Sequence, residues 1–164
     1  MMSQFEALLY QITSIFLLPA LVLILAALAY ALIATGQLLA DSLIFRRTPV
    51  RSGLSRYAQE QGITSDDLEL WIMRRLEKLR LTSRVSPLLG LVATLIPMGP
   101  ALLALAENEV ASVGSNMVVA FAGVTLALIA ASLSFVVLNI RRRWLFEELR
   151  LIEREQAGLS QEGV

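Results

Sequence analysis

The sequence predicts an all-α integral membrane protein whose three transmembrane helices extend into cytoplasmic helices. Hydrophobic residues make up 56% of the 164 residues, and the mean hydropathy is +0.66. Charged residues are only 17% of the chain and are concentrated outside three long apolar runs. Each run reaches the ~20 residues that a helix needs to cross the hydrocarbon core of a bilayer.

The N-terminal part predicts two elements. Residues 1–14 place apolar side chains at helical spacing, which predicts a periplasmic amphipathic helix lying in the membrane interface, although a plain extension of the next helix fits equally well. No charge occurs between residues 7 and 40, and residues 15–45 are therefore predicted as the first transmembrane helix. The N-terminus carries an acid and no base, which is unlike a signal peptide, so we expect this helix to be retained.

Residues 46–84 form the one sizeable polar segment, predicted as a cytoplasmic helical segment. Pro49 and Gly53 indicate a break, and residues 54–61 predict a short helix. Thr64 and Asp67 fit a capping box that opens a longer amphipathic helix. Its apolar stripe, which we expect to pack on neighbouring helices, consists of Leu68, Ile72, Leu76 and Leu79.

Residues 85–106 predict the second transmembrane helix, around which the other elements are arranged. The 22 uncharged residues between Arg84 and Glu107 would reach about 33 Å as a helix. Small residues recur at three- and four-residue steps and share one face, which suits close helix packing in lipid. This face consists of Gly90, Ala93, Thr94, Pro97, Ala101 and Ala104. The simplest interpretation is a tightly packed helix with no chemistry of its own.

After a predicted periplasmic loop at residues 107–116, residues 117–140 predict the third transmembrane helix. It also carries a small face, made of Ala120, Gly123, Ala127, Ala130, Ala131 and Ser134, and it contains Thr125. A short connection makes the second and third helices an antiparallel pair, whose small faces can meet each other or a shared axis. Residues 141–164 predict a cytoplasmic tail that begins as an amphipathic helix.

The distribution of basic residues predicts the orientation. Nine of the 14 basic residues lie in residues 46–84 and the other five follow Ile140. The positive-inside rule then places the N-terminus and the loop near Glu107 outside, and the middle segment and tail in the cytoplasm.

The composition also excludes several classes of function. The chain has no cysteine and no histidine, so we expect no cofactor, no metal site and no enzymatic activity. Balanced charges, 14 basic and 14 acidic, give no reason to expect nucleic acid. None of the three spans contains an ionisable residue, so a proton-titrating group in mid-membrane would have to belong to a partner.

Residues Pro87 to Thr94 read P-L-L-G-L-V-A-T and resemble a motif of the MotA/TolQ/ExbB proton channel family. Members of that family have a proline, a glycine three residues later and a glycine–threonine pair; here Ala93 replaces the second glycine. The third span is similar in carrying Thr125 and in ending at Asn139 before a basic cluster, but the acid near its start is replaced around Val119. The short middle segment resembles the three-helix TolQ/ExbB type.

The resemblance implies a homo-oligomeric ring, in the family a pentamer, in the inner (plasma) membrane. Its second and third helices would line a pore holding a single-span partner of the ExbD/TolR/MotB kind, whose intramembrane aspartate takes up and releases protons. Such a ring would convert proton flow into work on a periplasmic task. The expected pore-lining and partner-facing residues are Thr94, Thr125, Gly90, Ala93, Pro97, Ala101, Ala120, Gly123, Ala127 and Ala131.

A structural membrane scaffold that organises a partner without conducting ions remains the alternative, because small-residue faces would serve it equally well. A small transporter subunit is disfavoured, because no charged or strongly polar substrate site occurs at mid-membrane.

Overall fold

The computed structural model describes residues 8, 11–12, 14–45 and 65–162. Within these ranges the chain forms three long helices and no strand: α2 (Leu17–Phe45), α4 (Ser65–Ala106) and α5 (Val110–Glu162). Each is long and apolar enough to cross a membrane, over Leu17–Leu43, Asp67–Ala106 and Val110–Arg154. The predicted all-helical class, with three helices long and apolar enough to cross a membrane, is therefore confirmed. The expected helix at 54–61 and the capping residue Thr64 lie outside the described residues, as does most of the N-terminal amphipathic segment.

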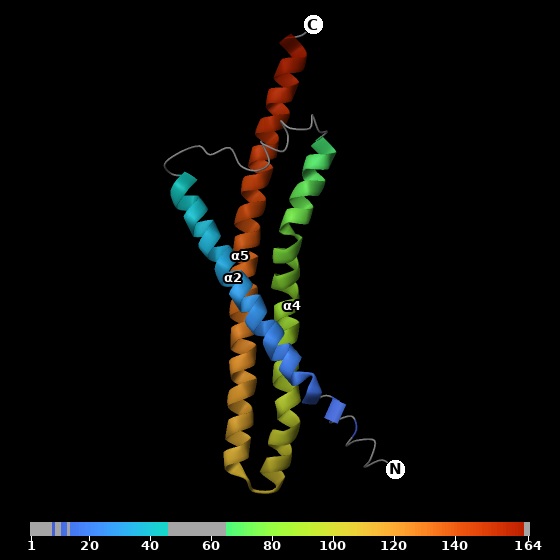
Figure 1. Cartoon of the computed structure of the whole chain (residues 1–164), viewed down its shortest axis with the longest axis vertical. Helices are drawn as coiled ribbons and strands as arrows, with labels where there is room; N and C mark the ends of the chain where they lie inside the picture. Colours follow the sequence, from blue (N-terminus) through green and yellow to red (C-terminus); the bar gives the residue numbers. More distant parts are fainter. Residues whose placement is uncertain (1–7, 9–10, 13, 46–64, 163–164) are drawn as a thin grey trace.

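α4 and α5 form a long hairpin, and α2 lies obliquely across it (Figure 1). The hairpin turn is at one end, and the other end carries the basic residues of α4 and α5, from Arg74 to Arg84 and from Arg141 to Arg143. We call the latter the basic end. α4 continues without interruption from its amphipathic part into its apolar part, through Pro87, Pro97 and Pro100.

The connection between α4 and α5 is shorter than the predicted loop at 107–116, because only residues 107–109 lie between the two helices. A Schellman motif ends α4: the Glu109 N–H donates to the Ala104 carbonyl at 2.8 Å, and the Asn108 N–H donates to the Leu105 carbonyl at 3.2 Å. Asn108 has a positive φ of 60°, as the residue after a helix often does in this motif. The polar residues beyond Val110 are helical rather than loop-forming.

Side-chain bonds to the local backbone explain why that polar segment is helical. Ser115 Oγ and Asn116 Nδ2 both donate to the Ser112 carbonyl, at 3.0 Å each. Ser112 Oγ donates to the Glu109 carboxylate at 3.1 Å. Short polar side chains that bond to neighbouring groups in this way are compatible with the first turns of a helix.

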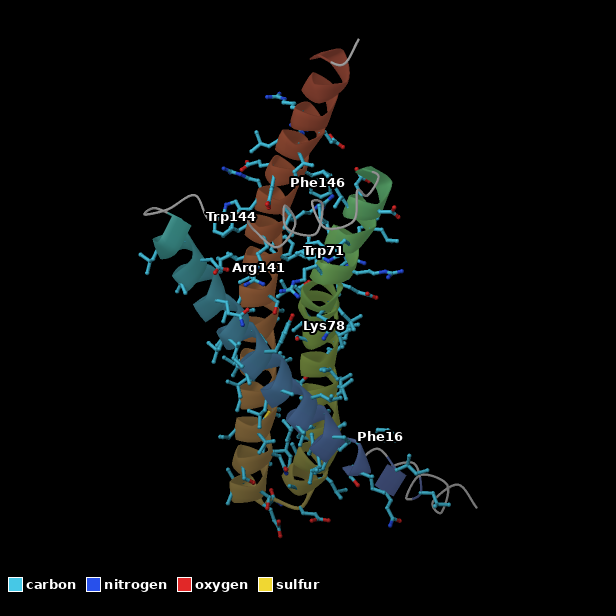
Figure 2. All side chains as sticks on the ribbon, turned by 45° about the horizontal axis from the view of Figure 1, so that its top comes forward. Phe16, Trp71, Lys78, Arg141, Trp144 and Phe146 are labelled. Atoms are coloured by element: carbon cyan, nitrogen blue, oxygen red, sulfur yellow. The ribbon has the colours of Figure 1, made fainter. Side chains whose placement is uncertain are left out.

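At the basic end the predicted apolar stripe of α4 is buried. Leu68, Ile72, Leu76 and Leu79 form one core with Val137 and Leu149 of α5 and with Ala34 and Leu38 of α2. The partly buried Trp71 and Trp144 pack against this core, and both lie in this part of the molecule in Figure 2. The amphipathic parts of the long helices are thus held to one another by apolar contact.

A polar contact joins α2 to α5 at the same level. Arg141 of α5 donates to the Gln37 side-chain carbonyl at 3.3 Å and lies 3.7 Å from the Asp41 carboxylate. Figure 2 shows Arg141 on α5 beside the C-terminal half of α2. This contact joins the C-terminal end of α2 to the hairpin.

Candidate functional site

The small faces of α4 and α5 meet each other, which is one of the two arrangements that the sequence left open. A Cβ atom on Gly90 would lie 2.9 Å from the Cβ of Ala127, and a Cβ on Gly123 would lie 3.0 Å from the Cβ of Ala93. Such distances leave no room for a larger side chain at either glycine. In lipid, where van der Waals contact is a main source of helix association, this close approach stabilises the hairpin.

α2 covers one side of the α4–α5 contact. Ile24 of α2 forms a buried cluster with Ala93 and Ala127, and Leu21, Leu89 and Leu126 pack around it. The flank of α4 that bears Leu89 and the flank of α5 that bears Leu126 therefore face α2. The opposite flanks of the hairpin are left without a neighbour in the described chain.

The expected site residues differ in how far a single chain exposes them. Eight of the predicted pore-lining residues are buried between helices of the same chain: Gly90, Ala93, Pro97, Ala101, Ala120, Gly123, Ala127 and Ala131. In a single chain these eight residues therefore offer little surface to another molecule. Their smallness serves the approach of two backbones within one subunit.

The two threonines keep exposed surface. Thr94 is partly exposed and lies five residues from Leu89, which is about 140° around the helix and so away from α2. Thr125 is exposed and lies two residues from Ala127, about 160° away from the contact with α4. We call the surface of the hairpin directed away from α2 the open face.

Thr94 and Thr125 lie at similar depth but not side by side. Thr94 follows Ala93 and Thr125 lies two residues before Ala127, and Ala93 and Ala127 belong to the same buried cluster. Because the helices are antiparallel, these positions lie at nearly the same level along the hairpin. Thr94 borders the α4–α5 contact, whereas Thr125 points outward from α5, so the structure does not bring the two hydroxyls together within one chain.

Two further polar residues share the side of Thr125 and were missed as site residues. Ser132 and Asn139 follow Thr125 at seven-residue steps, and all three side chains are exposed. Two turns of helix are close to seven residues, so the three form one polar stripe toward the basic end. The spacing 125, 132, 139 was visible in the sequence and would have identified them. We call these three residues the polar stripe.

The hydrogen bonds of these side chains determine what chemistry they offer. Thr94 Oγ1 donates to the Leu91 carbonyl at 2.7 Å, and Thr125 Oγ1 donates to the Phe121 carbonyl at 2.7 Å. Ser132 Oγ donates to the Leu128 carbonyl at 2.8 Å, and Asn139 Nδ2 donates to the Phe135 carbonyl at 2.9 Å. Each hydroxyl has a single proton, so its remaining capacity is to accept hydrogen bonds. The threonine and serine hydroxyls of the open face thus offer acceptors to water or to a protonated carboxyl group.

The surroundings of these acceptors are apolar and uncharged. Large exposed side chains on the same surface include Leu91, Met98, Phe121, Leu128 and Phe135. No ionisable side chain occurs from Val85 to Ala106 or from Val110 to Ile140. Among the described residues no group of three or more histidine, cysteine or acidic side chains could hold a metal ion. The open face therefore offers hydrogen-bond acceptors but no titratable group.

Comparison with known proteins gives one match. The sequence model of the MotA/TolQ/ExbB proton channel family matches residues 47–154, which is more than half of the chain. The matched range contains the whole of α4, the turn and α5 as far as Arg154, and hence the open face. Neither a curated protein nor a solved structure matches the chain.

Proposed function

Because this chain belongs to the MotA/TolQ/ExbB proton channel family, we propose that it is the ring-forming subunit of a proton-driven energy-transduction complex of the TolQ/ExbB type. The observation that carries this proposal is the open face. It combines mid-span hydrogen-bond acceptors, at Thr94 and along the polar stripe, with the absence of any titratable group in the helices that bear them. The subunit is not an enzyme in this proposal; it provides the environment in which another chain's acid changes protonation.

The chemistry of the open face defines the partner. A proton-driven complex needs a group that binds and releases protons, and the spans of this chain contain none. We assign that group to an aspartate on the single transmembrane helix of an ExbD/TolR/MotB-like partner. A charged side chain at the centre of a bilayer costs about 2.5–3.5 kcal/mol on insertion scales, so the aspartate favours its neutral form there. A neutral carboxyl group donates a hydrogen bond, which the hydroxyl oxygens of Thr94 and Thr125 can accept.

A ring of copies accounts for the separation of the two threonines within one chain. Thr94 borders one edge of the open face and Thr125 lies on the outward side of α5 at a similar depth. When hairpins stand side by side around an axis, with α2 outside toward lipid, the outward side of α5 in one copy approaches α4 of the next. Alternating threonines would then surround the partner helix at one level. The family resemblance suggests five copies.

The proposed orientation follows from the basic end. With the N-terminus outside, the bases from Arg46 to Arg84 and from Arg141 to Arg154 lie in the cytoplasm of a cell whose inner membrane holds the complex. The polar stripe then leads from mid-membrane toward the cytoplasmic side. A proton crossing 100 mV releases about 2.3 kcal/mol, so a few protons per step can drive mechanical work on the outer side.

The experiment is proton flux through the complex isolated from native membranes and placed in liposomes. The double variant Thr94→Val, Thr125→Val keeps the shapes of the side chains and removes both acceptors, so we expect flux to be lost while the assembly keeps its size. Thr35→Val is the matched control, because Thr35 Oγ1 makes the same type of bond, to the Ala31 carbonyl at 2.7 Å, but lies on α2. Full flux in the double variant with intact assembly would reject conduction along the open face.

Absence of proton flux through the unaltered complex with its partner bound would instead favour the second candidate, a scaffold that organises a partner without ion conduction. One observation supports it: the described hydroxyls of the open face already bond to their own backbone, so the surface is stable without an ion path. A scaffold would retain partner binding both in the double variant and in Thr35→Val. A conducting ring would lose proton flux in the double variant and keep it in Thr35→Val.

A further inference from the structure

Two serines differ from every other serine and threonine whose side chain the structure describes. Ten serine and threonine side chains donate to a nearby carbonyl or carboxylate: Ser14, Thr35, Ser42, Thr82, Ser83, Thr94, Ser112, Ser115, Thr125 and Ser132. Ser86 of α4 and Ser134 of α5 have no hydrogen-bond partner among the described residues. Both residues are also buried: 1% of the surface of Ser86 and 0% of the surface of Ser134 is exposed.

Ser86 and Ser134 belong to one level of the three-helix packing. The buried cluster contains Ile24, Ala93 and Ala127, one residue from each helix. A step of seven residues toward the basic end leads from these to Ala31 on α2, Ser86 on α4 and Ser134 on α5. The direction is consistent, because α2 and α5 run toward the basic end and α4 runs away from it (Figure 1). A displacement of seven residues is close to two helical turns, so Ser86 and Ser134 of the antiparallel pair repeat the positions of Ala93 and Ala127 about 10 Å nearer to the basic end. Ala31 is fully buried at 0% exposure.

The residues at this level include two hydroxyls without a hydrogen-bond partner and a small side chain on α2. The α2 position is occupied by Ala31 where the neighbouring level has Ile24. In addition, Pro87 has no N–H to donate to the Ser83 carbonyl in the α-helical pattern, so this oxygen lacks its usual donor. Two hydroxyls and one carbonyl that lack a usual partner thus belong to this part of the α4–α5 hairpin.

We propose that the junction of Ala31, Ser86 and Ser134 is a binding site for a single water molecule, which bridges the two serine hydroxyls and the Ser83 carbonyl. A buried water typically makes two to four hydrogen bonds to otherwise unsatisfied groups, and this site supplies three. A buried hydroxyl without a hydrogen-bond partner destabilises the folded state, so the water stabilises the hairpin where apolar packing alone would leave both hydroxyls unpaired. The site lies inside one subunit, is separate from the open face, and does not depend on the proposed function.

The first test is a double-mutant cycle with Ser86→Ala and Ser134→Ala in the full-length protein. Each single change removes one of the hydroxyls that hold the water and leaves the other hydroxyl buried with a less tightly bound water. The double change removes both hydroxyls. We expect the shift in the unfolding midpoint of the double variant to be smaller than the sum of the two single shifts. Ser115→Ala combined with Ser86→Ala is the matched control, because Ser115 is exposed near the turn and bonds to Ser112; these two shifts should add. Additive shifts for Ser86 and Ser134 would overturn the proposal.

The second test needs no variant. An experimental density map that resolves ordered water should contain a peak within hydrogen-bonding distance of both Ser86 Oγ and Ser134 Oγ. A map of that quality with no peak there, or with the two hydroxyls bonded directly to each other or to their own helices, would overturn the site even if the variants fail to fold.

Discussion

Gly90 of α4 lies so close to Ala127 of α5 that a Cβ atom on the glycine would approach the alanine Cβ to 2.9 Å. Val124 lies 3.4 Å from the same position, so the contact is closed on more than one side. Since the neighbouring Gly123–Ala93 contact is similarly tight, the two helices approach closely over about one turn. We expect the hairpin to behave as a rigid unit to which α2 is added.

The first prediction concerns this contact. Gly90→Leu should destabilise the protein by about 1–3 kcal/mol or prevent hairpin formation, because overpacking a tight contact forces helices apart. Gly36→Leu is the control, since nothing lies within 4 Å of a Cβ built on Gly36. The unfolding midpoints of the detergent-purified variants provide the comparison, and equal midpoints for the two variants would refute the close packing.

The second prediction concerns the turn between α4 and α5. Asn108 has φ of 60°, a conformation that costs most L-residues about 1–2 kcal/mol. We expect Asn108→Gly to leave stability unchanged or higher and Asn108→Val to lower it by about that amount. Thermal unfolding of both variants measures the difference. If valine were as stable as glycine, α4 would end by a different geometry.

The third prediction concerns the contact of α2 with α5. Arg141 lies 3.7 Å from Asp41, and because Asp41 is exposed we expect Asp41→Asn to change stability by less than about 1 kcal/mol. The change should instead widen the range of distances between the C-terminal end of α2 and α5. The sequence has no cysteine, so spin labels on cysteines introduced at Leu43 and Arg150 report that distance directly.

Glu147→Gln provides the matched control for this experiment. Glu147 accepts a bond from Arg143 at 3.0 Å within α5, and its loss does not involve α2. An unchanged distance distribution in Asp41→Asn, or an equal broadening in Glu147→Gln, would argue against a specific role of the Arg141–Asp41 contact.

The fourth prediction concerns assembly. We expect native mass spectrometry of the gently extracted protein to give a closed homo-oligomer, with five copies by family resemblance. The physical reason is that Thr94, Thr125 and Ser132 keep exposed surface in mid-span, where a neighbouring helix can pack on polar side chains more favourably than lipid can. A monodisperse monomer that still binds its partner would leave the scaffold as the better account.

The sequence alone determined the class of the molecule and the periodicities of its helices. Three uncharged runs are enough to predict helices that span a membrane, because backbone polar groups in lipid must be satisfied within a helix. The spacing of Gly90 and Ala93, and of Gly123 and Ala127, predicted a small face on each helix, and the motif from Pro87 to Thr94 identified the family that the matched range confirms. The stripe from Leu68 to Leu79 was likewise predicted as a packing surface and is buried.

Only the tertiary structure decided which surface each face meets. A small face can pack against a neighbouring helix of the same chain or line an axis shared by several chains. Both arrangements require the same spacing of small residues in the sequence. The turn at Glu107 to Glu109 holds α4 and α5 in an antiparallel hairpin, so their small faces pack against each other within the chain. Contact with α2 covers one side of that hairpin, and Thr94 and Thr125 remain on the other. Helical periodicity fixes directions around one axis, whereas the relative rotation of several helices follows from which surfaces pack most closely in lipid.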